Sequence, residues 1–281
     1  MFYFQLYEAF PVIMKHLPGP HNDIFSNYKL LQDFVKEVVV KHKAELDPSE
    51  NTAIYFTSSI PDQKPHETTD GFDEENIVPC VLDLFLAGTE TTSTALCWGL
   101  IYLITYPEVQ EKVQEEIDRV TGRSKEPRIA DKANMPYTEA VIHEILRFGE
   151  IVPMNGLNQW CNLSQYEIFL FYCFNQGTAI LPILHSVLFD ENEWETPYEF
   201  NPGHFLDKEG KFVRRDAFMP FSAGKRVCLG EQLARMELFL FFVSLLGKFR
   251  FSAAEGEKLS LDGVIGVTRT PHPFKIHATA R

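Results

Sequence analysis

The sequence lacks the cysteine patterns of a disulfide-stabilised or zinc-binding protein. Its five cysteines are an odd number at irregular spacings, and no two of them form a CxxC pair. These features argue against a disulfide framework and a structural zinc site. Reduced thiols are the simpler expectation, which favours a compartment facing the cytosol. The cysteines are Cys80, Cys97, Cys161, Cys173 and Cys228.

Long apolar runs and an excess of positive charge are also missing. No stretch of about 18 apolar residues without charges occurs, and Met1 to Phe10 is short, polar and without a basic region. We therefore expect no transmembrane anchor within this chain. Lysine and arginine number 26 against 39 acidic residues, a formal net charge of -13. This balance disfavours nucleic acid as a partner.

The composition and the apolar periodicity of the chain predict a folded, mainly α protein with a minor β part. The chain has 281 residues, of which 45% are hydrophobic and 24 are phenylalanine, so an aromatic-rich core is expected. Pro107 suits the first turn of a helix, and Gly122 suits its end. Apolar periodicity predicts helices over residues 26–45, 75–105, 108–120, 137–148 and 229–246, a loop over 46–74 and a strand near the C-terminus.

The strongest chemical signal is the segment FSAGKRVCLG, residues 221–230. A glycine-bearing loop can bring backbone N–H groups close to a sulfur atom. Cys228 directly precedes an apolar helix, whose N-terminus stabilises an anion such as a thiolate. Arg226 supplies a cation beside it. For an isolated cysteine, the alternative is an inert thiol buried in a turn.

This segment resembles the haem-binding signature FxxGxRxCxG of the cytochrome P-450 monooxygenases. The fixed positions are Phe221, Gly224, Arg226, Cys228 and Gly230. The resemblance implies that Cys228 is the thiolate ligand of a haem b iron and favours O–O cleavage. It also implies that Arg226 pairs with a haem propionate.

A second motif lies within the predicted helix 75–105. Residues 87–92, AGTETT, resemble the oxygen-activation motif of the family's long central helix. Glu90 and Thr91 would then relay protons to bound dioxygen. Without the haem loop, the same residues would indicate only a polar kink in a helix.

A third motif pairs Glu144 with Arg147. The i,i+3 spacing places both side chains on one helix face, which fits a surface ion pair equally well. In the family this pair is buried and supports the haem loop. The segment FNPGHF places His204 where many members carry arginine, so His204 is expected to complete the network; a simple loop histidine is the alternative.

The stretches PYTEAVIHEILR, NEWETPYEFNPGHFLDKEGKF and GEQLARMELFLFF resemble the microsomal second family, most closely its J-like subfamily. This resemblance predicts a truncated cytochrome P-450 fold over residues 1–281, a single haem-thiolate monooxygenase domain without the N-terminal anchor and first helices. The segment 156–177 also departs from relatives, which carry a propionate-binding arginine there. Near the N-terminus, Phe10, Val12, Ile13, Met14 and Leu17 would contact lipid or, alternatively, pack in the core.

The resemblance implies a monooxygenase acting on a polyunsaturated fatty acid or xenobiotic at the cytosolic face of the endoplasmic reticulum. Electrons would come from NADPH through a separate flavin reductase or from a small haem electron carrier. Lys225 and Arg235 are expected to provide a positive docking patch. Two alternatives remain open: a catalytically inactive fragment with weak or no haem binding, and a helical interaction domain without a cofactor.

Overall fold

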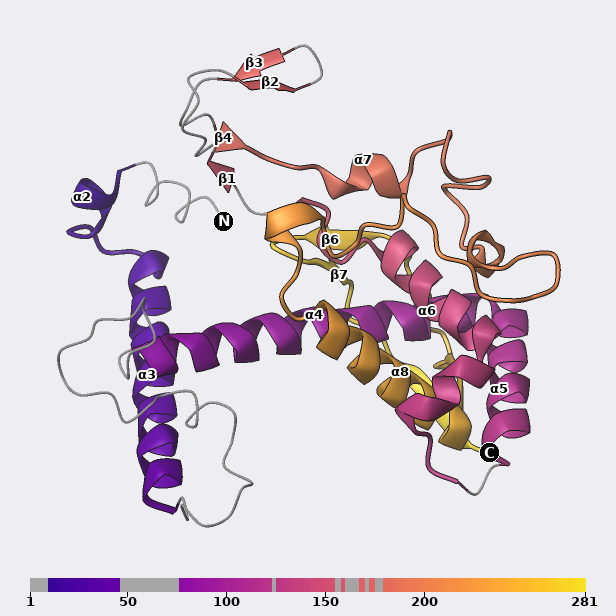
Figure 1. The fold of residues 1–281 in the computed structure, drawn as a ribbon. Helices are drawn as coiled ribbons and strands as arrows, with labels where there is room; N and C mark the ends of the chain where they lie inside the picture. Colours follow the sequence, from indigo (N-terminus) through magenta and orange to yellow (C-terminus); the bar gives the residue numbers. More distant parts are fainter. Residues whose placement is uncertain are drawn as a thin grey trace. The chain divides into compact units, whose positions relative to one another are not determined.

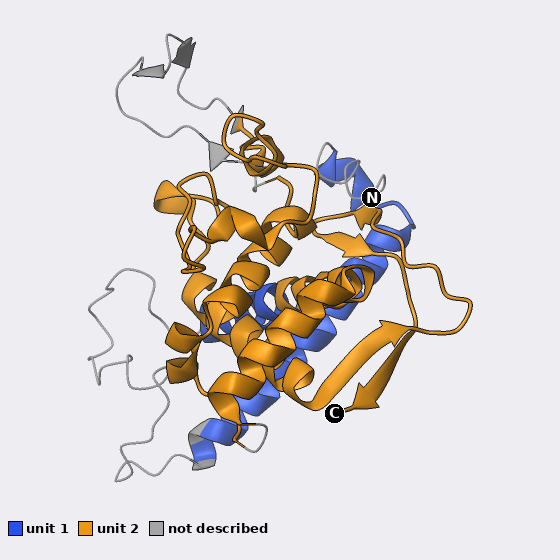
Figure 2. Cartoon of the chain, turned by 90° about the vertical axis from the view of Figure 1, so that its right-hand side faces the viewer, with its two compact units in different colours: residues 1–89 blue, residues 90–281 orange. Residues whose placement is uncertain are grey.

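The computed structural model describes residues 10–45, 76–122, 125–154, 158–159, 167–169, 172–174 and 179–281. The chain divides into two compact units, residues 1–89 and residues 90–281 (Figure 2). Helix α4 (Ile77–Thr105) contributes to both units. The loop predicted for residues 46–74, and most of the segment 156–177, lie outside the described residues.

The first unit contains α2 (Pro11–Met14), α3 (Pro20–Glu45) and the beginning of α4 (Figure 1). The helix predicted from residue 26 begins earlier, at Pro20. Proline is compatible with a first helical turn because its missing N–H has no intrahelical partner there. The buried His21 ring fixes the turn before α3, since its Nε2 lies 2.8 Å from the Met14 carbonyl oxygen.

The second unit is built on the end of α4, α5 (Pro107–Thr121), α6 (Pro136–Gly149) and α8 (Glu231–Lys248). Pro107 occupies the first turn of α5, and Gly122 ends it with a φ of 64°, so both predictions are confirmed. A Cβ on Gly99 would lie 3.1 Å from Ile145 and 3.2 Å from Phe242. The small residue therefore allows α4 to approach α6 and α8 closely.

Aromatic rings fill much of the core between these helices. The Tyr102 ring stacks with Phe200 and Trp98 at centroid distances of 4.8 and 5.5 Å. Trp98 and Tyr102 are fully buried. The 3₁₀ helix η2 (Ile129–Asn134) precedes α6 and also packs against α5 and α8.

The strands form small antiparallel pairs. Strand β5 (Phe249–Ala253) pairs with β8 (Ile276–Ala280), with Phe251 opposite Ala278. The strand predicted near the C-terminus is thus confirmed. The remaining pairs are β6 (Gly263–Ile265) with β7 (Arg269–Pro271), β1 (Asn158–Gln159) with β4 (Ala179–Ile180), and β2 (Glu167–Phe169) with β3 (Tyr172–Phe174).

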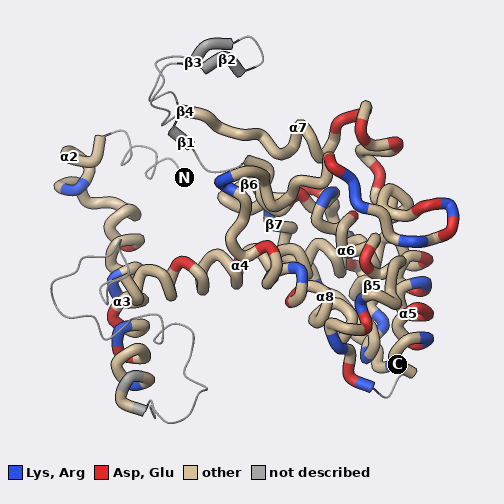
Figure 3. Tube along the Cα trace, viewed as in Figure 1, with Lys and Arg blue, Asp and Glu red and all other residues tan. Residues whose placement is uncertain are grey.

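Charge is distributed unevenly over the helices (Figure 3). Acidic and basic residues follow one another along α5, whereas Asp83 and Glu90 are the only charged residues in the sequence of α4. Residues 83–90 of α4 are exposed, whereas Ile101, Tyr102 and Leu103 near its end are buried. Glu90 is the last charged residue of α4 before this buried part.

Candidate functional site

The segment 221–230 forms a closed loop immediately before α8. The Cys228 N–H donates to the Phe221 carbonyl at 2.8 Å, so the two ends of the loop meet. Gly224 begins the 3₁₀ turn η4 (Gly224–Arg226) with a φ of 70°, a conformation that glycine adopts without a steric cost. The Glu231 N–H donates to the Cys228 carbonyl at 3.3 Å as α8 begins.

Residues 223–229 of this loop are exposed, whereas Phe221 packs against the core. Cys228 and Arg226 are exposed, and the next residue, Leu229, has 92% of its surface exposed. A Cβ placed on Gly224 or Gly230 would meet no atom within 4 Å. A soft sulfur ligand, a cation and neighbouring apolar side chains match the chemistry of an apolar macrocycle that carries an iron and carboxylates. The residues of the loop therefore fit haem.

The predicted proton-relay residues lie on α4. Glu90 is exposed, and its Oε1 lies 3.3 Å from the Thr268 hydroxyl, which comes from the β6–β7 turn. Thr91 is half-buried. The next residue, Thr92, is buried, and its hydroxyl has no hydrogen-bond partner within the described part of the chain. The relay role of Glu90 and Thr91 stays a prediction.

Burial of Cys97 raises the pKa of its thiol, and the charge of Glu90 acts in the same direction. Cys97 is therefore held in its neutral thiol form, which is a poor metal ligand. Cys80 is exposed on the earlier part of α4. Among the described residues, no group of three or more His, Cys, Asp and Glu side chains is arranged to hold a metal ion.

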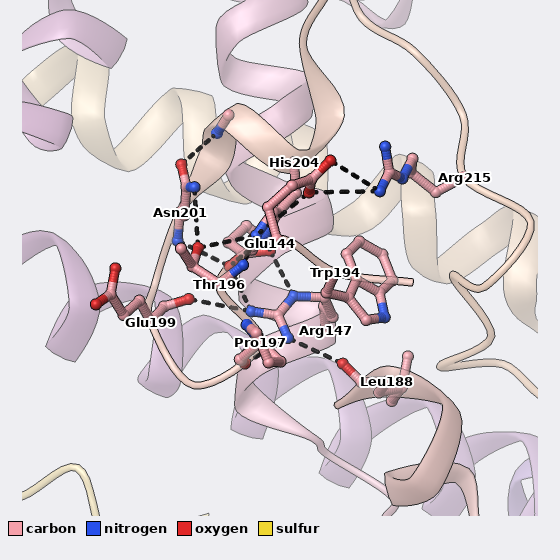
Figure 4. Close-up of polar contacts among 12 residues, drawn as sticks. Glu144, Arg147, Leu188, Trp194, Thr196, Pro197, Glu199, Asn201, His204 and Arg215 are labelled. Atoms are coloured by element: carbon pink, nitrogen blue, oxygen red, sulfur yellow. Dashed lines mark hydrogen bonds and ion pairs between the residues drawn. The ribbon is translucent and has the colours of Figure 1, made fainter. Parts of the chain in front are cut away.

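Glu144 and Arg147 form a bidentate ion pair on α6 (Figure 4). The Arg147 Nε and Nη2 donate to Glu144 Oε2 and Oε1 at 2.8 and 2.7 Å. Both side chains are fully buried. A bidentate pair of this kind has planar, directional hydrogen bonds, so it fixes geometry as well as charge.

Arg147 also holds the irregular segment that follows α7 (Leu184–Leu188). Its remaining donors reach the carbonyl oxygens of Leu188, Pro197 and Glu199 at 2.9, 2.8 and 3.1 Å (Figure 4). Its guanidinium carbon lies 5.0 Å from the Trp194 ring centre. One buried cation therefore binds three carbonyls of a segment whose own backbone hydrogen bonds form separate turns.

His204 joins the network from the 3₁₀ helix η3 (Pro202–Phe205). Its Nε2 accepts the Thr196 backbone N–H at 3.2 Å, and its Nδ1 lies 3.3 Å from Glu144 Oε2. Because a backbone N–H can only donate, Nε2 carries no proton. The neutral imidazole therefore has its proton on Nδ1, which donates to Glu144. The structure thus brings Arg147 and His204 together around the Glu144 carboxylate.

Three residues near these sites make contacts that could not be predicted from the sequence. Thr268 contacts Glu90, and His143 lies one residue before Glu144 on the buried side of α6. Arg235 was expected in a docking patch, but its side chain is only 20% exposed and is bound to Glu231. Lys225 is exposed, as docking requires. The burial of His143 had one sequence signal, its place among apolar residues in EAVIHEIL.

A sequence profile described as cytochrome P450 matches residues 1–278. The chain is 49% identical to human cytochrome P450 2J2 over 276 residues, 98% of this chain and 54% of that protein. It is 47% identical to mouse cytochrome P450 2J5, covering 99% of this chain and 54% of the relative. It is 44% identical to mouse cytochrome P450 2C44, covering 99% and 56%. The chain therefore spans about half the length of these curated relatives.

Proposed function

Because the chain belongs to the cytochrome P450 family, with J-like relatives of its second family, we propose that it supplies the thiolate side of a haem-dependent monooxygenase. The observation that carries this proposal is the closed loop 221–230. It presents an exposed thiol at the start of α8, beside an exposed arginine and open glycines. Cysteine binds iron through its sulfur as the thiolate.

The bound haem would supply the one-electron and dioxygen chemistry that amino-acid side chains lack. Cys228 would hold the iron through its sulfur, and Arg226 would pair with a propionate. Phe221 accepts the Cys228 N–H through its carbonyl, which fixes the backbone from which the sulfur projects. Open space surrounds Gly224 and Gly230, since neither has an atom within 4 Å of an added Cβ, and this leaves room for a cofactor at the loop.

Glu90 and Thr91 would hold and pass the protons that the reaction consumes. Asp83 is the other charged residue in the sequence of their helix, so Glu90 is the carboxylate next to Thr91 that can hold and release a proton. In balance, one atom of O₂ enters the substrate. The other leaves as water, which consumes two protons and two electrons. The two electrons would come from NADPH through a separate flavin reductase or through a small haem electron carrier.

We propose lipophilic substrates, either a polyunsaturated fatty acid or a xenobiotic, and a position at the cytosolic face of the endoplasmic reticulum. Phe10, Val12 and Ile13 have 57%, 69% and 60% of their surfaces exposed, which supports contact of this segment with lipid. Met14 is buried, so it packs in the protein core instead of contacting lipid. Within the described ranges, no helix is long and apolar enough to cross a bilayer.

The competing proposal is a fragment that binds haem weakly or not at all. It is favoured by the share of its relatives' length that the chain covers, 54% for the human protein. One experiment separates the two. The full chain is expressed with haem supplied, reduced, and exposed to carbon monoxide, and its absorption spectrum is recorded.

A red-shifted Soret band typical of thiolate ligation is the expected result, and Cys228→Ala should abolish it. Cys80→Ala is the matched control, because it removes another exposed thiol that lies outside the loop. Folded protein that takes up no haem would support the competing proposal, a fragment that binds haem weakly or not at all. A band that persists unchanged in Cys228→Ala would overturn the ligand assignment.

A further inference from the structure

The Arg235 side chain links the start of α8 to α6. Its Nε and Nη2 donate to Glu231 Oε1 at 2.9 and 2.8 Å, one turn earlier on the same helix. Its Nη1 lies 2.8 Å from Nε2 of His143 on α6. An arginine remains protonated and can only donate. The imidazole nitrogen is therefore the acceptor in this contact.

His143 is held in a form that suits this role. Its Nδ1 lies 2.8 Å from the Glu139 carbonyl oxygen, so the single proton of the neutral ring is on Nδ1. The ring also contacts Phe212 and Phe218 at centroid distances of 4.6 and 4.7 Å. Burial lowers the pKa of His143 to about 3, which keeps Nε2 available as an acceptor over the ordinary pH range.

The same guanidinium also contacts the signature loop. Its carbon lies 5.0 Å from the Phe221 ring centre and 5.4 Å from that of Phe218, distances at which a cation is attracted to an aromatic face. The Phe221 carbonyl is the group that accepts the Cys228 N–H at 2.8 Å. A continuous series of contacts therefore runs from His143 through Arg235 and Phe221 to Cys228.

We infer that Arg235 is a positioning residue for Cys228, which it orients through Phe221 while anchored to His143. This inference rests on the proposed ligand role of Cys228. Arg235 differs from the exposed Lys225 in its degree of burial and in having its donors already engaged. It serves the thiolate from inside the protein rather than as a surface charge for a redox partner.

The test compares Arg235→Gln with Arg281→Gln in the full chain. Arg281 is the matched control: its side chain is 13% exposed, and it binds the Leu246 carbonyl and Asp118 at 2.8 Å each, at the other end of α8. Both variants lose a half-hidden arginine that ties α8 to its neighbours. Only Arg235→Gln loses the contact with Phe221.

The first measurement needs no haem and is the hydrogen exchange of the Cys228 amide. We expect Arg235→Gln to speed this exchange by at least about tenfold, because the loop opens locally, while Arg281→Gln leaves it unchanged. Arg235→Lys should also fail to restore protection, since an ammonium cannot bind Glu231 and His143 as a planar fork. Equal exchange in both glutamine variants would overturn the inference.

The second measurement is haem affinity, read from the thiolate-type Soret band. Loss of a group that supports a metal ligand commonly weakens metal binding by about tenfold or more, and we expect this in Arg235→Gln only. His143→Gln, which retains an acceptor, should bind haem more tightly than His143→Leu. Identical haem affinities for His143→Gln and His143→Leu would contradict the role of His143 as the acceptor that anchors Arg235.

The two proposals can fail separately. If the wild-type chain takes up no haem, the proposed function fails, while the amide exchange still tests whether Arg235 holds the loop. If Cys228 is shown to ligate iron but Arg235→Gln behaves like Arg281→Gln, the inference alone is overturned.

Discussion

Arg269 contacts the indole of Trp98 with both its side chain and its main chain. The guanidinium carbon lies 4.3 Å from the Trp98 ring centre, and Trp98 Nε1 donates to the Arg269 carbonyl at 2.8 Å. A Cβ on Gly263 would lie 2.9 Å from the same indole. These contacts fasten the β6–β7 hairpin to α4, and the hairpin in turn brings Thr268 to Glu90.

We expect Trp98→Phe to lower the free energy of unfolding by about 1–3 kcal/mol. The variant keeps an aromatic ring but removes the indole N–H and leaves the Arg269 carbonyl without that donor. The amide of Arg269, which donates to the Ile151 carbonyl at 2.8 Å, should exchange its hydrogen faster. Urea unfolding and hydrogen exchange measure the two effects. Tyr198→Phe, at a position 64% exposed, is the control; equal stabilities for the two variants would refute the role of the indole.

Glu144→Gln should be severely destabilising. The change leaves the Arg147 guanidinium buried without its countercharge, and breaking a buried ion pair in this way costs about 3–5 kcal/mol. Glu209→Gln breaks the exposed Lys211–Glu209 pair instead and should cost less than about 1 kcal/mol. Chemical denaturation of both variants tests the difference. A double variant, Glu144→Gln with Arg147→Met, should recover part of the loss; a further loss would contradict the explanation.

His143 should make the protein less stable in acid. Its pKa falls from about 6.5 to about 3 on folding, so between these values the unfolded chain binds the proton more readily. Its contribution to stability is complete above pH 6.5 and is lost progressively as the pH falls toward 3. From pH 7.5 to pH 4.5, the wild type should lose roughly 2–3 kcal/mol more than His143→Gln, which cannot titrate. If the free energies of unfolding of the two proteins changed with pH in the same way, His143 would not be the source of the loss of stability in acid.

Alanine should have opposite effects at two glycines that both have free space around them. Gly224 has a φ of 70°, so Gly224→Ala should destabilise the folded chain by about 1 kcal/mol and shift the Cys228 loop. Gly88 lies inside α4, where alanine should be more stable than glycine by about 0.5–1 kcal/mol. Thermal unfolding of the two variants checks the signs. A stabilising Gly224→Ala would mean that the loop does not require glycine at residue 224 to adopt its left-handed conformation.

The features that could be predicted from the sequence depend on neighbouring residues. Pro107 and Gly122 predicted the bounds of α5 because a proline ring and a left-handed glycine act on the backbone where they stand. The signature loop was predicted for the same reason, since its glycines and Cys228 lie within ten consecutive residues. The beginning of α3 was missed by six residues because its first turn lacks the apolar periodicity.

The sequence by itself therefore determined the family, the mainly helical class, and the loop that presents Cys228. The tertiary structure alone decided which polar groups far apart in the sequence are paired. Arg147 reaches carbonyls 41 to 52 residues away, Arg235 meets His143 across 92 residues, and Thr268 meets Glu90 across 178. Helix propensity and loop glycines act locally, whereas these pairs exist only because packing of the core brings donors and acceptors from distant parts of the chain together.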